Sequence, residues 1–269
     1  MIISVSIVLY KTNHSELRNV YECLLQSAMD FQLILVDNSP DDSLRNILIE
    51  ERIKYIFTGK NIGFGRGHNR AIKEIIDQSD FHLVLNSDIS FSSNVIRSLV
   101  DYMTQHPGVG QIMPKVLSPD GNIQYLCKLI PTPFDLIFRR FLPSAFLKKR
   151  RDKFQLKFTG YNNIMEVPYL SGCFMLFRTY AFKNVGLFDE RFFMYPEDID
   201  LTRRINEKYL TIFFPEVWIT HHHAKESYKN GYMLAVHAFN MIKYFNKWGW
   251  FFDTKRVNTN KNILKKLTA

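Results

Sequence analysis

The chain has 269 residues, and its 35 Lys and Arg against 26 Asp and Glu give a net charge of +9. With 46% hydrophobic and 14% aromatic residues it is too apolar for a disordered chain or an acidic solvating tail, and long enough for one or two globular domains. Its three cysteines, Cys23, Cys127 and Cys173, lie far apart, without the spacing of a disulfide framework or a zinc site. We therefore expect a reducing compartment.

The positive charge is concentrated in two stretches. Residues 134–158 and 243–266 each carry a net charge of +6, so the rest of the chain carries −3. Both stretches interleave cationic and aromatic side chains, which suits the interface of an anionic bilayer. In the alternative, the aromatic residues pack into the core and the cations form a solvated face. The sequence shows neither a signal peptide nor an apolar run of the ~20 residues that a membrane-spanning helix needs.

In the first half of the chain, β-branched runs alternate with segments of helical period, which predicts a parallel α/β sheet. The predicted strands are Ile3–Leu9, Gln32–Val36, Lys54–Phe57 and His82–Leu85. The predicted helices are Ser15–Ser27, Ser43–Glu51, Gly67–Ile76 and Val95–Thr104.

The second half follows a proline-containing stretch, Ile130–Pro143. The pattern there predicts a strand pair within Tyr169–Phe177 and a loop through Gly186–Glu190. It then predicts a helix from Pro196 to about Lys208, a strand over Val217–His223 and a long helix from Gly231 to Trp248.

Polar residues follow several of the predicted strands. Tyr10-Lys11-Thr12-Asn13 follows the first, Asp37-Asn38-Ser39 the second and Asn86-Ser87-Asp88 the fourth. Each group alone is typical turn chemistry. Because ligands of open α/β sheets bind outside the carboxyl ends of the strands, their joint placement indicates a binding site.

A glycine-rich loop, Asn61–Asn69, opens the third predicted helix. A helix N-terminus of this kind can face a phosphate, and the alternative is a flexible strand-to-helix connection. The loop does not match the dinucleotide fingerprint, because its third glycine comes one residue early. It also lacks the Gly-Lys-Ser/Thr of a P-loop. The glycine spacing therefore speaks against a dinucleotide-dependent oxidoreductase.

Two further segments carry groups for acid–base or metal chemistry. Pro196 begins a helix whose first turn contains Glu197, Asp198 and Asp200. Acids there complement the helix dipole, and one of them can also take a proton from an attacking hydroxyl. In the strand ending His221-His222-His223, period-2 alternation puts His221 and His223 on one face, where they can bind a divalent metal together with Asp88.

These segments belong to a set of seven motifs that occur in a fixed order. The motifs are Val5–Tyr10, Leu35–Ser39, Asn61–Gly65 with Asn69, Leu85–Asp88, Gly172–Leu176 with Arg178, Phe188–Phe193 and Glu197–Leu201.

Together the motifs resemble family 2 glycosyltransferases of the GT-A fold, and in particular the rhamnosyltransferase branch of bacterial O-antigen and surface polysaccharide synthesis. The resemblance implies an α/β fold whose mostly parallel nucleotide-binding sheet is flanked by helices, with a C-terminal acceptor-side half and basic amphipathic helices. It implies a GT-A domain over 1–230, divided into a nucleotide-sugar half (1–130), a basic amphipathic insertion (131–166) and an acceptor and catalytic half (167–230). Residues 231–269 form a basic aromatic helical extension.

The resemblance also implies roles for single residues. Asp37 accepts the N3–H of uracil or thymine, and Asp88 is the last carboxylate of a metal motif that reads Asn86-Ser87-Asp88 here. His221 is the late metal-binding histidine, with His223 as the competing assignment. Asp198 is the base, beside Glu197. The other nucleotide-binding residues are Tyr10, Thr12, Asn61, Gly63, Asn69 and Asn86.

The implied reaction is an inverting transfer of a sugar, rhamnose from dTDP-rhamnose, to a polyprenyl-diphosphate-linked saccharide acceptor, with Mg²⁺ or Mn²⁺ as cofactor. The implied location is peripheral, on the inner face of the cytoplasmic membrane. The alternative is a UDP-sugar donor, as in a glucosyl-, galactosyl- or galactofuranosyltransferase. A more distant alternative is a non-catalytic basic protein that binds membrane or nucleic acid. We expect no nucleic-acid partner, because no recognition motif accompanies the basic stretches and strand-end carboxylates repel phosphate.

Overall fold

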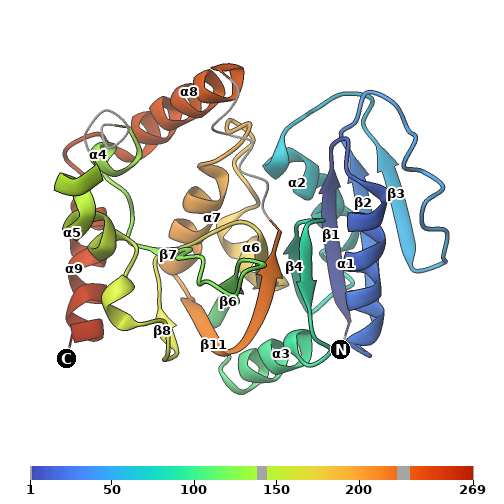
Figure 1. Ribbon diagram of the computed structural model, residues 1–269, viewed down its shortest axis with the longest axis horizontal. Coiled ribbons are helices and arrows are strands. Elements are labelled where there is room, and N and C mark those ends of the chain that lie inside the picture. Colours follow the sequence, from blue (N-terminus) through green and yellow to red (C-terminus); the bar gives the residue numbers. More distant parts are fainter. Residues whose placement is uncertain (1, 138–143, 223–230, 269) are drawn as a thin grey trace.

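The structure is a computed structural model that describes residues 2–137, 144–222 and 231–268. Its centre is a mixed sheet of nine strands in the order β3-β2-β1-β4-β10-β6-β11-β5, with β8 paired to β11 (Figure 1). The strands are β1 (Ile3–Leu9), β2 (Phe31–Asp37), β3 (Ile53–Phe57), β4 (Phe81–Leu85), β5 (Ile89–Phe91), β6 (Val109–Leu117), β8 (Met165–Glu166), β10 (Phe174–Arg178) and β11 (Leu210–His221). This confirms the predicted α/β fold.

Strands β1 to β4 form the parallel half of the sheet. β1 pairs in parallel with both β2 and β4, and β2 pairs in parallel with β3. These four strands are the predicted ones, with ends within one residue. β10 is antiparallel to β4, with Phe174 opposite Leu85, so the second half of the chain continues the sheet of the first.

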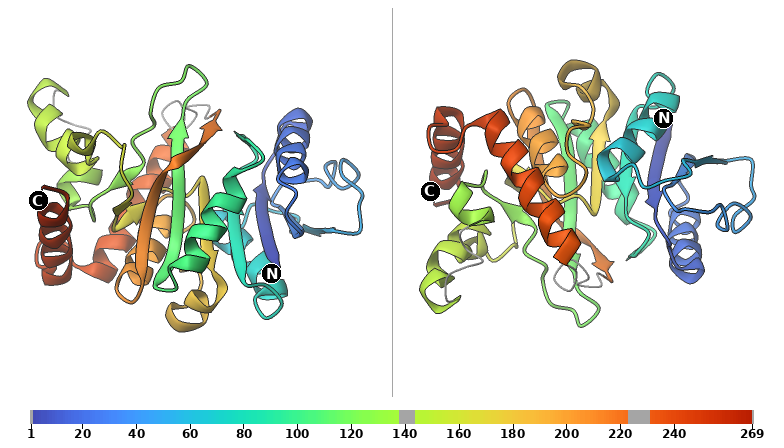
Figure 2. Two further views of the ribbon diagram at one scale, coloured as in Figure 1. Left: turned by 90° about the horizontal axis from the view of Figure 1, so that it is seen from below. Right: turned by 90° about the horizontal axis from the view of Figure 1, so that it is seen from above.

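Helices cover both faces of the sheet (Figure 2). α1 (His14–Gln26) and α3 (Val95–Gln105) pack on one face through the largest hydrophobic cluster, which includes Val5, Ile7, Leu17 and Leu99. The opposite face is covered by α2 (Phe64–Ile75), α6 (Thr179–Val185) and α7 (Glu197–Asn206). Alternate side chains of each strand therefore pack into two separate hydrophobic cores, one on each face of the sheet.

The remaining elements lie beside the second half of the sheet. β7 (Cys127–Lys128) and β9 (Tyr169–Leu170) form a small antiparallel sheet of their own. α4 (Pro133–Leu136), α5 (Ser144–Phe154) and a 3-10 turn (Lys157–Thr159) belong to the predicted basic insertion. α8 (Gly231–Trp248) and α9 (Thr254–Thr268) form the C-terminal extension, and α8 has the predicted bounds.

Two sequence predictions are wrong. Residues 43–51 form turns and not a helix. Leu44 is buried, but the Ser43 N–H bonds to the Asp41 carboxylate, a local turn bond that competes with helix formation. The strand pair within Tyr169–Phe177 is also wrong: β9 and β10 exist but pair with β7 and with β4 and β6 instead of with each other.

No helix in the described ranges has the length and apolar character needed to cross a bilayer.

Candidate active site

The carboxyl ends of β1, β2 and β4 meet at one edge of the sheet, the upper edge in Figure 1. Backbone bonds hold the segments after them together: Asn38 N–H donates to Leu9 O (2.8 Å), and Lys11 N–H donates to Ser39 Oγ (2.9 Å). Tyr10, at the end of β1, is half exposed, and Thr12 Oγ1 accepts a hydrogen bond from its N–H. The predicted clustering of polar strand ends is therefore present.

Asp37 is a fully buried carboxylate at the end of β2. Its Oδ1 accepts the Ser39 N–H at 2.8 Å, and its Oδ2 accepts a hydrogen bond from the Tyr55 hydroxyl of β3. Burial first, and then this bond, raise the pKa of Tyr55, so the phenol remains a donor. The two donors fix the carboxylate in one orientation, and its remaining lone pairs can accept from a ligand.

The glycine-rich loop is shaped by close packing. Gly63 has φ +92°, and a side chain there would meet Phe193 O at 2.4 Å. A side chain at Gly67 would meet Val8 of β1 at 2.6 Å. Asn61 Oδ1 accepts the Gly63 N–H at 3.0 Å. The glycines therefore bring α2 against β1 and against the loop that precedes α7.

Asn69 holds α2 to the segment before α7. Its Oδ1 accepts the Phe188 N–H (3.0 Å), and its Nδ2 donates to Phe188 O (2.9 Å) and to the Glu190 carboxylate (3.1 Å). The side chain is buried and these bonds use both ends of its amide. The nucleotide contact implied for Asn69 by resemblance stays a prediction.

Asp88 and His221 form the candidate metal pair. His221 ends β11, which pairs with the short strand after Asp88, and His221 Nε2 lies 3.3 Å from Asp88 Oδ2. His221 Nδ1 lies 3.0 Å from Gln124 Oε1 and can only donate to that oxygen. Burial lowers the pKa of His221, but Asp88 and Cys173 raise it to about 10. His223 lies outside the described residues.

This pair fits a divalent ion that is shared with a diphosphate. Adjacent ligands of an octahedral Mg²⁺ or Mn²⁺ ion lie about 3 Å apart, close to the observed separation. The bond to Gln124 keeps a proton on Nδ1, so Nε2 is the nitrogen that a metal would bind when it displaces the proton there. In the described part of the chain, no group of three or more His, Cys, Asp or Glu residues is arranged to hold a metal. Phosphate oxygens and water must therefore complete such a site.

The acidic pair opens α7. Asp198 is buried, and its Oδ2 accepts the Gly172 N–H (2.9 Å) while its Oδ1 accepts the Ile199 N–H (2.7 Å). Cys173, the residue after Gly172, accepts the Asn86 N–H through its carbonyl oxygen at 3.0 Å. Gly172 and Cys173 therefore connect the carboxylate of α7 to the strand end that carries Asp88.

The two carboxyl groups of this pair differ in their surroundings. Burial raises the pKa of both, and the charge of Asp198 raises the pKa of Glu197 further. Lys128 and the backbone N–H donors lower the pKa of Asp198. Glu197 Oε2 is buried and, among the described residues, has no hydrogen-bond partner. Asp198 therefore ionises before Glu197, which suits it for the role of base.

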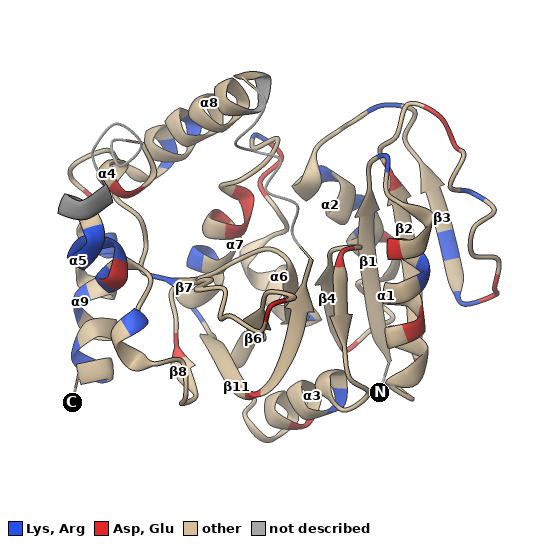
Figure 3. Ribbon diagram, in the orientation of Figure 1, with Lys and Arg blue, Asp and Glu red and all other residues tan. Residues whose placement is uncertain are grey.

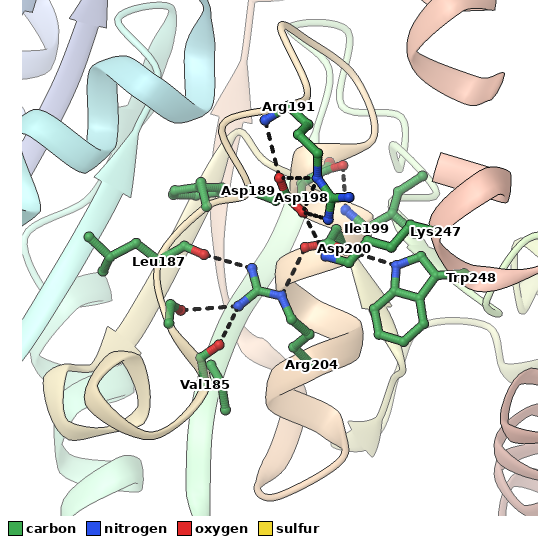
Figure 4. Close-up of polar contacts among 12 residues, drawn as sticks. Val185, Leu187, Asp189, Arg191, Asp198, Ile199, Asp200, Arg204, Lys247 and Trp248 are labelled. Atoms are coloured by element: carbon green, nitrogen blue, oxygen red, sulfur yellow. Dashed lines mark hydrogen bonds and ion pairs between the residues drawn. The ribbon is translucent and has the colours of Figure 1, made fainter. Parts of the chain in front are cut away.

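A network of charges anchors α7 to the C-terminal extension (Figure 4). Asp200 accepts from Arg204 (2.8 Å), from the Trp248 indole (2.8 Å) and from Lys247 (2.5 Å). Lys247 also pairs with Asp189 at 2.8 Å. Tyr244 and Phe245 on α8 are fully buried. The core-packing alternative therefore holds for the aromatic residues Tyr244 and Phe245, but Lys247 is paired with carboxylates and does not lie on a solvated face.

The sequence reasoning missed two residues of this site. Tyr55 reaches Asp37 because β3 pairs with β2, and Lys128 lies near α7 because β7 pairs with β9, which packs against that helix. A tyrosine inside a predicted strand and a lysine in a two-residue strand carry no local signal. Only the pairing of the strands brings them to the site.

The family model described as Glycosyl transferase family 2 matches residues 4–186. The chain is 27% identical over 213 residues to the N-acetylglucosaminyl-diphospho-decaprenol L-rhamnosyltransferase of Mycobacterium tuberculosis, covering 71% of this chain and 66% of that protein. It is 28% identical over 214 residues to the low-salt glycan biosynthesis hexosyltransferase Agl10 of Haloferax volcanii (78% and 63% covered). It is 22% identical over 268 residues to Rhamnosyltransferase WbbL of Escherichia coli K12, covering 96% of each.

Solved structures share the fold. The mannosyltransferase PcManGT from Pyrobaculum calidifontis, in complex with GDP-Man and Mn²⁺, has a TM-score of 0.59 at 13% identity, over 90% of this chain and 64% of that one. S. aureus TarS 1–349 has a TM-score of 0.54 at 17% identity, over 90% and 66%. The match to the family model covers well over half of the chain. The chain belongs to glycosyl transferase family 2.

Proposed function

We propose that this protein is an inverting glycosyltransferase that moves a sugar from a nucleotide diphosphate to an acceptor hydroxyl. The observation that carries the proposal is the junction at Gly172 and Cys173. This junction joins the buried Asp198 carboxylate to the end of β4, which leads to the Asp88–His221 pair, and Asp37 ends β2 at the same edge of the sheet. One edge of the sheet thus offers a base, a nucleobase acceptor and a cation site.

In the proposed reaction Asp198 accepts the proton of the acceptor hydroxyl. The acceptor oxygen forms a bond to C1 of the sugar as the bond from C1 to the diphosphate breaks, and the nucleoside diphosphate leaves. One displacement inverts the anomeric centre, so no covalent sugar–enzyme intermediate is needed. A Mg²⁺ or Mn²⁺ ion held by Asp88 and His221 would neutralise charge on the diphosphate.

For the donor we propose dTDP-rhamnose. Two of the relatives are rhamnosyltransferases by name, which supports rhamnose as the sugar. The alternative is a UDP-sugar, because uracil and thymine present the same N3–H to Asp37. We propose that the nucleotide is contacted by Asp37 together with Tyr10, Thr12, Asn61 and Asn86.

For the acceptor we propose a saccharide linked to a polyprenyl diphosphate, since the name of the mycobacterial relative contains such a lipid. We also propose peripheral attachment to the inner face of the cytoplasmic membrane. α8 lies on the side of the molecule where β1, β2 and β4 end (Figures 1 and 2). Its outward residues Leu234, Phe239 and Ile242 are exposed, as are Phe251 and Phe252 beyond it.

A nucleotide-release assay with a panel of dTDP-, UDP- and GDP-sugars tests the proposed function. We expect dTDP release from dTDP-rhamnose that requires both a divalent cation and a lipid-linked saccharide. Acceptor-dependent release from a UDP-sugar alone would replace rhamnose by the alternative donor. Absence of acceptor-dependent release across the panel, with donor binding intact by calorimetry, would contradict the proposed transfer.

A further inference from the structure

One cation in the candidate site comes from outside the sequence motifs. Lys128 lies on β7 opposite Tyr169 on β9. Its Nζ is 4.7 Å from the centroid of the Tyr169 ring and 3.5 Å from the Tyr169 hydroxyl. Tyr169 is 6% exposed and packs beside Tyr244 and Phe245 of α8. The ring therefore holds the ammonium group in a defined place.

The same short sheet leads directly to the proposed base. Gly172, two residues after the end of β9, donates its N–H to Asp198 Oδ2 at 2.9 Å. The charge of Asp198 also raises the pKa of Tyr169, after burial, so the two side chains interact. Tyr169 also packs in one hydrophobic cluster with Ile199, the residue after Asp198, so Lys128, Tyr169 and Asp198 lie together where the small sheet meets α7.

The charges around this cluster are unequal. Adjacent buried carboxyl groups cannot both ionise without cost, so Glu197 and Asp198 compete for one negative charge. Tyr169 and Tyr244 stay neutral because burial raises the pKa of each. The nearby cations Lys247 and Arg204 are bound to Asp200. The charge of Lys128 lowers the pKa of Asp198, against the burial that raises it.

We propose that Lys128 is a positioning residue for the transfer reaction, whose ammonium group, held over Tyr169, keeps Asp198 ionised and leaves the proton on Glu197. The proposal rests on the proposed function of Asp198 as the base. In this proposal Lys128 determines which of the two carboxyl groups, Glu197 or Asp198, accepts the proton of the acceptor hydroxyl. Without this charge the pair shares one proton less selectively, and Asp198 ionises only at higher pH.

Titration of Asp198 in the free protein tests this directly. The ¹³Cγ signal of Asp198, assigned by its absence in Asp198→Asn, should titrate about one pH unit higher in Lys128→Met than in the wild type. Lys128→Arg should restore the wild-type midpoint because it keeps the charge. Lys153→Met, which removes an exposed lysine of α5, is the matched control and should leave the midpoint unchanged. An unchanged Asp198 midpoint in folded Lys128→Met would overturn the proposal.

The pH profile of kcat/KM supplies a second readout. The acidic limb should move to higher pH in Lys128→Met and return in Lys128→Arg, whereas a purely structural loss would lower the whole curve without moving the limb. A drop of this second kind would count against the proposal. If no donor is turned over, the proposed function fails, while the titration of Asp198 still decides the role of Lys128.

Discussion

Ionised Glu197 is unfavourable for folding because it is buried beside Asp198. Its pKa is raised by burial and by the charge of Asp198, so the folded protein holds this proton more tightly than the unfolded chain. Between the unfolded and the folded pKa the native state binds more protons, and stability falls as pH rises through that range. Ionised Glu197 therefore destabilises the fold at alkaline pH.

We predict that Glu197→Gln is more stable than the wild type by about 2 kcal/mol at pH 8.5, and about equally stable near pH 4. Thermal unfolding across this range measures the difference. Glu190→Gln is the control, because the Asn69 bond first, and Lys73 and Arg66, lower the pKa of Glu190. It should show no gain at alkaline pH. Parallel stability curves for Glu197→Gln and the wild type would refute the assignment.

At the scale of single residues, the sequence predicted the groups that follow strands better than the groups that lie within them. Asp37 and Asp88 were found because strand ends are marked by polar turns, and the structure places them at one sheet edge. Tyr55 and Lys128 were missed because their places depend on pairing between β2 and β3 and between β7 and β9. Such registers are set by tertiary packing and leave no local pattern.

At the scale of elements, the contact between α7 and the C-terminal helices is the most consequential. Arg203 of α7 is 2% exposed and binds Asp253, between α8 and α9, through two bonds of 2.7 and 2.8 Å. The Arg203 guanidinium also lies 3.9 Å from the centroid of the Trp248 ring. A buried charge of this kind depends on its partner, because the interior offers no water to replace it.

We predict that Asp253→Ala lowers the free energy of unfolding by about 3–5 kcal/mol, since it leaves Arg203 buried and unpaired. The exposed pair Lys255–Glu207 (3.0 Å) also joins the α9 and α7 segments, and Glu207→Ala should cost only about 0–1 kcal/mol. Urea unfolding of the three proteins measures both values. Equal effects of the two substitutions would show that the buried pair does not anchor the extension.

Among the elements, β6 shows why a central strand escaped the sequence analysis. It contains Gly110 and Pro114, residues that normally argue against a central strand. A side chain at Gly110 would meet Tyr209 at 2.7 Å, so close packing of β6 requires the glycine. Pro114 lies opposite Phe214, where the pairing of β11 shifts register before Trp218. Because β11 is irregular at this point, the pairing tolerates the N–H that Pro114 lacks.

At the scale of the whole molecule, some of the cations behind the net charge of +9 are paired with buried carboxylates and others lie on the surface. Lys and Arg gather on α5 and α9, and acids on the first turn of α7 (Figure 3). The cation Lys247, counted in the sequence as part of a basic surface, is bound to Asp189 and Asp200. The second stretch exposes both kinds of side chain: Phe251 is 73% and Phe252 97% exposed, and Lys261, Lys265 and Lys266 of α9 are exposed as well. The alternation of strands and helices predicted the fold. The ion-pair partners of these charges could not be predicted from the sequence, because tertiary contacts bring them together.

We predict that the protein sediments with vesicles containing anionic phospholipid, and that the double substitution Phe251→Ser, Phe252→Ser reduces the bound fraction several-fold, because it removes two exposed aromatic side chains. Ile49→Ser, at an exposed apolar residue of the turns before β3, is the control and should bind like the wild type. Equal binding of all three proteins would show that Phe251 and Phe252 do not contribute to membrane binding.

The most direct test of the central claim compares wild-type protein with Asp198→Asn in one experiment, measuring donor affinity by calorimetry and acceptor-dependent nucleotide release by turnover. The substitution keeps the size of the side chain and an oxygen for the Gly172 N–H, but removes the proton acceptor. We predict donor affinity within about threefold of the wild type and transfer reduced by about 10²-fold or more. Turnover at the wild-type rate by Asp198→Asn would contradict the account.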